Sequence, residues 1–178
     1  SFIFFTYGPT AEKLHGPGLR HIDYETLKSI VEQAKGDASL KRILSTFYDD
    51  GGLVASEAKG PNELYRQHLL SQLHERGTQL PFPIVFDRLK VEKDDKFPDG
   101  LRFDLADEES VAHYDPTVPQ YGGLRRLYRN GDLGLSAYSD DLPNSYGAGR
   151  VSFVKGVAPQ NFELERRVQE AIRVLQSR

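Results

Sequence analysis

The sequence predicts an α+β fold in which helices and an antiparallel sheet occupy separate parts of the chain. Apolar residues recur at helical spacing through the first half and at strand spacing through most of the second. This order differs from the alternating βαβ order of a nucleotide-binding sheet. We expect a single domain over residues 1–178. It would contain an N-terminal strand, a helical layer, an antiparallel sheet of about five strands and a C-terminal helix packed on the sheet.

The N-terminal region is predicted to begin with a buried strand and to continue into a helix. Ser1–Tyr7 is rich in aromatic residues and is stopped by Gly8-Pro9. Glycine and proline recur up to Arg20, which indicates a loop with one helical turn at Thr10–Leu14. Asp23 is then a favourable N-cap for a helix that ends at Gly36.

Two more helices are predicted before the pattern changes. One begins at Asp37, has an apolar face up to Phe47, and is ended by Asp49-Asp50-Gly51-Gly52. The other covers residues 62–76 and ends at Gly77. Because the connections are short, we expect these helices to be antiparallel neighbours.

The second half is predicted to form strands and turns. Ile84–Glu92 and Leu101–Leu105 are strand candidates, joined by the turn residues of 93–96 and 98–100. Asp107–His113 is interpreted as one helical turn, and Asp115–Pro119 as a loop.

The strongest local pattern is a hairpin with the turn Asn130-Gly131, because a type I′ turn needs positive φ at both central residues. Its strands would be Leu124–Arg129 and Asp132–Tyr138, which places Arg129 opposite Asp132. Arg150–Lys155 is predicted as a last strand and Phe162–Gln176 as a final helix. The expected core comprises Phe2, Phe4, Leu27, Ile30, Leu44, Phe47, Leu69, Val85, Phe103, Leu127, Leu135, Val151, Phe153, Val168 and Ile172.

The composition is that of a soluble globular protein, for which we expect a cytoplasmic location. It is 38% hydrophobic and 28% charged, and the net charge of −3 does not favour nucleic acid or an anionic membrane as a partner. The absence of cysteine excludes disulfides, thiolate metal ligands and cysteine nucleophiles. The chain starts at Ser1 and contains no Met, which favours a processed protein or a piece of a longer one.

Two loops are candidate binding surfaces. Tyr7, Gly8 and Thr10 follow an apolar strand, where glycine lets the backbone approach a ligand and expose its amide donors. The segment Asp140–Gly149 is rich in small polar and aromatic residues, as adaptable contact loops are. Tyr138, Asn144 and Tyr146 are its candidate contact residues. The alternative for this segment is a long solvated turn.

Acidic residues and a histidine suggest an alternative, carboxylate-centred enzyme site. Asp140 and Asp141 could hold Mg²⁺ or Ca²⁺, although Asp is a favoured turn residue and turn formation is the preferred interpretation of this pair. His113 lies between acidic residues, which would raise its pKa and suit it to act as a general acid or as a pH sensor. An ordinary surface histidine is the competing interpretation.

A third interpretation concerns the arginines of the hairpin. Arg125, Arg126 and Arg129 lie close to several tyrosines, a combination that can grip a nucleic acid backbone. Strand alternation would send Arg125 and Arg126 to opposite faces, so an exposed, salt-bridged hairpin is the alternative.

The first functional interpretation is a non-catalytic binding domain that acts within a larger assembly or a longer chain and has a protein partner. No cofactor is expected, because the sequence has no metal-ligand spacing and no phosphate-binding loop. No membrane span is expected, because the longest apolar run is Phe2–Phe5. A metal-assisted hydrolase or transferase that uses His113, Asp140 and Asp141 is the alternative, followed by nucleic-acid binding.

Overall fold

A computed structural model describes residues 19–45, 48–106, 110–129, 131–137, 142, 150–151, 153–155, 171–173 and 175–176. The predicted strand Ser1–Tyr7 and most of the predicted final helix lie outside these residues. The elements in chain order are β1 (Leu19–His21), α2 (Tyr24–Gly36), α3 (Ala38–Leu44), β2 (Tyr48–Ala55), α4 (Glu63–Glu75), β3 (Ile84–Asp87), β4 (Lys90–Lys93), the 3-10 helix η2 (Pro98–Gly100), β5 (Leu101–Asp104), β6 (Val111–Tyr114), β7 (Leu124–Arg129), β8 (Leu135–Ser136), β9 (Arg150–Val151) and β10 (Phe153–Lys155).

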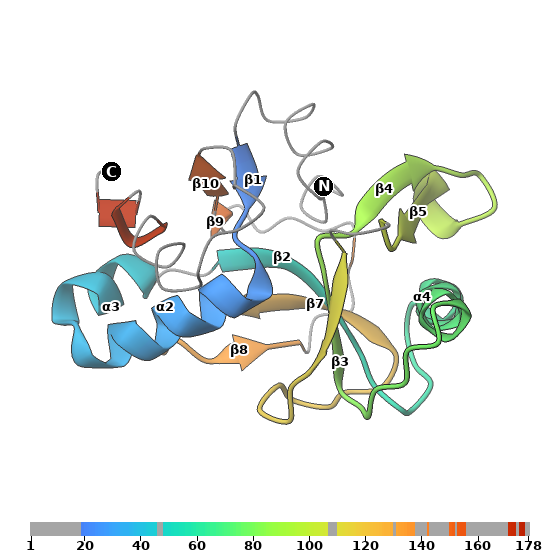
Figure 1. Ribbon diagram of the computed structural model, residues 1–178, viewed down its shortest axis with the longest axis horizontal. Helices are drawn as coiled ribbons and strands as arrows, with labels where there is room; N and C mark the ends of the chain where they lie inside the picture. Colours follow the sequence, from blue (N-terminus) through green and yellow to red (C-terminus); the bar gives the residue numbers. More distant parts are fainter. Residues whose placement is uncertain are drawn as a thin grey trace.

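The centre of the molecule is an antiparallel sheet, so the α+β prediction is confirmed. Its strands follow the order β6-β3-β2-β7-β8, and β9 joins it by pairing parallel with β2. Two smaller sheets, β1 with β10 and β4 with β5, complete the described strands. In Figure 1, helices α2 and α3 lie at one end of the molecule and α4 at the other.

Helices α2 and α3 begin where the sequence predicts, because each has an aspartate at its N-cap. Asp23 accepts a hydrogen bond from the Thr26 N–H, and Asp37 accepts from the Ser39 and Leu40 N–H groups. These bonds satisfy donors that a helix start leaves without intrahelical partners.

Helix α4 matches its predicted range but lies on the other face of the sheet from α2. Leu53 and Ala55 of β2 pack with Leu69 of α4, whereas Val54 packs with Tyr24 at the start of α2. Successive strand residues face opposite sides of a sheet, so the two helices cover opposite faces. The expectation that α4 neighbours the first two helices is therefore wrong.

Helix α4 is separated from α3 by a strand, although Asp49-Asp50-Gly51-Gly52 has the sequence pattern of a helix end. Tyr48–Ala55 is β2, the central strand, and its pairing with β7 shifts register between Asp49 and Leu53. A Cβ on Gly52 would lie 3.2 Å from both the Leu127 Cδ2 and the Phe86 carbonyl oxygen. Gly52 therefore lies at a β-bulge, where Leu127 and Phe86 approach the backbone closely. It does not end a helix.

The hairpin of β7 and β8 forms, but its loop is longer than the predicted two-residue turn. Arg129 pairs with Leu135 and not with Asp132. Asp132 instead accepts a hydrogen bond from the Gly134 N–H, and Leu133 has a φ of 69°. The side chains of Arg126 and Arg129 are buried, so the prediction of an exposed arginine hairpin is wrong for these two residues.

Three further segments differ from their predictions. Leu19–His21 forms β1 because it pairs with β10, a strand far away in the sequence. The predicted strand Ile84–Glu92 is broken at Arg88, whose φ of 55° separates β3 from β4. Val111–Tyr114 is β6 and not part of a helical turn, because it pairs along the whole of β3.

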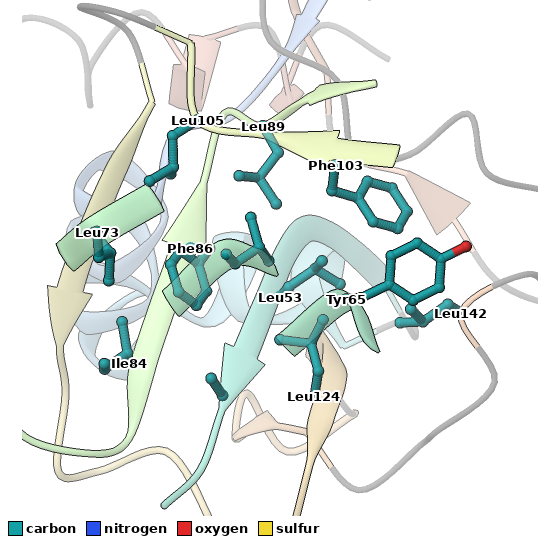
Figure 2. Packing of buried hydrophobic residues seen from close by; sticks show 12 residues of the cluster. Leu53, Tyr65, Leu73, Ile84, Phe86, Leu89, Phe103, Leu105, Leu124 and Leu142 are labelled. Atoms are coloured by element: carbon teal, nitrogen blue, oxygen red, sulfur yellow. The ribbon is translucent and has the colours of Figure 1, made fainter. Parts of the chain in front are cut away.

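The main core lies between α4 and the sheet, and the β4–β5 hairpin closes it. Figure 2 shows Tyr65 and Leu73 packed toward Phe86, Leu89 and Phe103. The predicted core residues Leu27, Ile30, Leu44, Leu69, Val85, Phe103, Leu127 and Ile172 are buried, whereas Leu135 is only partly buried. Phe2, Phe4, Phe47 and Val168 lie outside the described residues, as do the side chains of Val151 and Phe153.

A second cluster joins α2 and α3 to residues near the end of the chain. Ala171 and Ile172 are helical and buried in a cluster with residues of both helices, including Ile30. Among the helices that the structure describes, none is both long and apolar enough to span a bilayer.

Candidate functional site

The described candidate residue His113 lies where the first turn of α2 meets strand β6. Its Nδ1 atom is 3.1 Å from Glu25 Oε1, and its ring centroid is 5.3 Å from that of Tyr24. Burial lowers the pKa of His113, and the Glu25 carboxylate only partly offsets this effect. The expectation that acidic neighbours raise this pKa is therefore wrong, because removing the imidazolium from water has the larger effect.

Asp115 follows β6 and anchors α2 through several donors. It accepts hydrogen bonds from the Tyr24 hydroxyl, from the Thr117 N–H at 2.9 Å and from the Thr117 hydroxyl at 2.6 Å. Lys28 Nζ lies 2.9 Å from its Oδ2 atom. Burial alone would raise the pKa of Asp115, but these donors outweigh burial and hold the pKa well below its usual range. The carboxylate is thus ionised, and it joins α2 through Tyr24 and Lys28 to its own loop through Thr117.

Asp87, at the end of β3, is the third polar group at this junction. It is 3% exposed, and its Oδ2 atom accepts a hydrogen bond from the Tyr24 N–H at 2.8 Å. Burial raises the pKa of Asp87 to about 6, although the hydrogen bonds from the backbone N–H groups of Tyr24 and Arg88 act to lower it. The sheet therefore places a buried acid at the N-terminus of α2.

Strand β6 forms an edge of the main sheet beside this junction. Among the strands that the structure describes, only β3 pairs with it. Asp115 donates its N–H to the Pro83 carbonyl oxygen, and hydrogen-bonded pairs alternate along an antiparallel ladder. The N–H and C=O groups of Ala112 and Tyr114 consequently point away from β3, toward the open side of the strand.

A second polar cluster covers the outer face of the β4–β5 hairpin. Arg102 contacts Glu92, Asp94 and Asp104 at 3.1, 2.8 and 2.8 Å. Arg102 donates hydrogen bonds to the carboxylates of Asp104 and Asp94, and these bonds raise the pKa of Arg102 and stabilise its positive charge. Asp104 also lies 2.8 Å from His68 Nε2 on α4. Because each charged group has an opposite partner, this cluster is best explained as the attachment of the hairpin to α4.

The structure brings few of the predicted site residues together. His113 is described, whereas Tyr7, Gly8, Thr10, Tyr138, Asp140, Asp141, Asn144 and Tyr146 lie outside the described residues. The grouping of His113 with Asp140 and Asp141 in an enzyme site stays a prediction. Within the described part of the chain, no group of three His, Asp or Glu side chains is arranged to hold a metal ion.

The contributions of Tyr24 and Asp87 to this junction were not predicted from the sequence. Asp87 ends the apolar run Ile84–Phe86, and an acid there was the available indication of a special environment. Its partner could not be found, because Tyr24 is 63 residues away along the chain.

Comparison with known proteins adds no family assignment. No protein-family model, no curated protein and no solved structure matched the chain significantly. The fold and site together define an α+β domain with a buried acidic junction beside a sheet edge.

Proposed function

We propose that this chain is a non-catalytic interaction domain, and that it binds an extended segment of a partner protein along β6. The observation that carries the proposal is the outward direction of the N–H and C=O groups of Ala112 and Tyr114. A partner strand could continue the sheet by pairing with these groups, which is the chemistry of strand addition.

The side chains beside β6 suggest what the partner strand would carry. On one face of the sheet Tyr114 is 46% exposed, and its largely apolar ring is accessible to a partner side chain. On the other face the Glu25 carboxylate, which is 52% exposed, lies beside His113. A strand with an apolar or aromatic residue on one face and a basic residue on the other would match both, since partner strands also alternate.

Residues 8–21 and 140–149 are the contact loops expected from the sequence; because Leu19–His21 forms β1, residues 8–18 and 140–149 belong to the same proposal as further contact surfaces. Their small polar and aromatic residues suit recognition of a protein surface. The protein partner and the larger assembly are part of this proposal.

The experiment is a binding screen with short synthetic peptides that alternate apolar and basic residues. Wild type is compared with Ala112→Pro and Ala112→Val. Proline removes only the outward N–H, which an edge strand tolerates, whereas valine adds similar volume and keeps that N–H. We expect peptides that bind wild type and Ala112→Val equally, with affinity at least about tenfold weaker for Ala112→Pro.

Hydrogen exchange on the wild-type protein provides a test that needs no substitution. A bound peptide should slow exchange of the Ala112 and Tyr114 amides, because they would become donors to the added strand. The proposal is wrong if no alternating peptide binds, or if bound peptides leave both amides unprotected. Retained binding by a folded Ala112→Pro variant would also contradict it.

A further inference from the structure

The first turn of α2 is surrounded by ionisable groups from α2 itself, from β3 and from β6. Helix α2 and its N-cap contribute Asp23, Tyr24, Glu25 and Lys28; β3 and the residue after it contribute Asp87 and Arg88; β6 and the following loop contribute His113 and Asp115. Two of these groups are the basic side chains Lys28 and Arg88, while four are carboxyl groups. Loss of water and the neighbouring carboxylates oppose an ionised carboxylate here, whereas nearby cations and hydrogen-bond donors favour it.

The buried carboxyl groups of Asp87 and Asp115 differ in how well the fold supports their charge. Asp115 has the ammonium of Lys28 at 2.9 Å and hydroxyl donors from Tyr24 and Thr117. Asp87 is held by backbone N–H groups, and its nearest described cation, Arg88 Nε, is 3.7 Å away, beyond hydrogen-bond distance. A cation in direct contact favours the ionised form, and among the described residues only Asp115 has one, so Asp87 has the weaker support.

We propose that the Asp87 carboxyl group is a proton-binding site, and that its occupancy couples the docking of α2 on the sheet to pH. The Tyr24 N–H bond to Asp87 is the physical link, since the same oxygen atom bonds the helix and belongs to the titrating group. The inference concerns the fold itself and does not depend on binding at the β6 edge.

The burial of Asp87 supports this inference and determines the direction of the effect. Burial raises its pKa from 3.8 to about 6, so between about pH 6 and pH 4 the folded protein holds a proton that the unfolded chain lacks. A raised folded-state pKa means that proton uptake favours the folded form. Asp87 alone would lower the unfolding equilibrium constant by up to about tenfold per pH unit as pH falls through this window.

The direct experiment is an NMR titration of the wild-type protein. We expect the Asp87 carboxyl carbon to titrate near pH 6, and the Tyr24 amide proton to shift with the same midpoint. A midpoint for Asp87 at or below the ordinary 3.8 would overturn the proposal. If the chemical shift of the Tyr24 amide proton does not change as Asp87 titrates, the proposed coupling to α2 is wrong.

Variants separate Asp87 from the other ionisable groups. Asp87→Asn keeps an oxygen acceptor for Tyr24 but cannot titrate. The ratio of wild-type to variant unfolding constants should therefore fall by up to about tenfold per pH unit between pH 6 and 4. His113→Asn is the control, because Asp87 should retain its titration there. A constant ratio for Asp87→Asn would contradict the proposal, and so would loss of the Asp87 titration in His113→Asn.

Discussion

At the scale of single residues, two loops approach each other so closely that only glycine fits between them. A Cβ on Gly123 would lie 2.4 Å from the Pro61 carbonyl oxygen, and a Cβ on Gly60 would lie 2.6 Å from the Gly122 carbonyl carbon. Backbone hydrogen bonds join the two loops, from the Ser56 N–H to Gly123 and from the Gly123 N–H to Ala58. These contacts hold the start of β7 against the loop before α4.

Alanine substitutions at three glycines measure the free-energy cost of adding a side chain where the two loops meet. Gly36→Ala meets open space and should stabilise the protein by up to about 1 kcal/mol, because alanine favours helix. Gly77→Ala also meets open space but at a φ of +67°, and should cost about 1–2 kcal/mol. Gly123→Ala combines positive φ with a backbone clash and should cost more than about 3 kcal/mol. Urea unfolding measures all three, and equal costs for Gly77→Ala and Gly123→Ala would contradict the close approach.

At the scale of elements, the attachment of α2 to the loop after β6 depends on the ionised Asp115. Asp115→Asn removes the partner of Lys28 and should cost about 2–3 kcal/mol at pH 7. The folded-state pKa of Asp115 is depressed, so its contribution is present above the unfolded pKa of 3.8 and is lost as pH falls below it. The difference in stability between wild type and variant should therefore shrink below pH 4.

Chemical unfolding of wild type and Asp115→Asn from pH 7 to pH 2.5 tests this prediction. Asp37→Asn is a suitable control, because asparagine retains the N-cap of α3 and the residue is exposed. A difference for Asp115→Asn that stays constant over the whole range would show that the carboxylate charge is not what stabilises the junction.

At the scale of the whole molecule, helices cover both faces of one sheet, and the described hydrophobic residues form clusters on each side. Leu69 belongs to the α4 cluster and Ile30 to the α2–α3 cluster, and both are fully buried. Alternate residues of β2 contribute to the cores on the two faces, Leu53 with α4 and Val54 with Tyr24. A single domain, as the sequence predicts, should therefore unfold as one unit.

We expect a single unfolding transition that involves both the α4 cluster and the α2–α3 cluster. Leu69→Ala and Ile30→Ala should each cost about 2–5 kcal/mol. Each should shift one coincident transition by far-UV circular dichroism and tyrosine fluorescence, whereas Leu64→Ala, 47% exposed on α4, should change little. Two separate transitions, each moved by only one of the variants, would contradict the single-domain prediction.

The sequence alone determined the fold class and the features that depend on near neighbours along the chain. Asp23 and Asp37 mark helix starts through bonds to residues two or three positions away, and the apolar periodicity of residues 62–76 locates α4. These interactions are local, so their pattern can be read without knowing the fold.

Only the tertiary structure decided β2, β6 and the surroundings of His113 and Asp87. The glycines of β2 favour a turn locally, and its neighbours β3 and β7 make it the central strand. Val111–Tyr114 becomes an edge strand because it pairs with β3, and His113 is thereby partly buried, with its ring beside that of Tyr24. Such pairing and burial involve residues distant in sequence. The free energy that they contribute outweighs the weak local preferences of these segments.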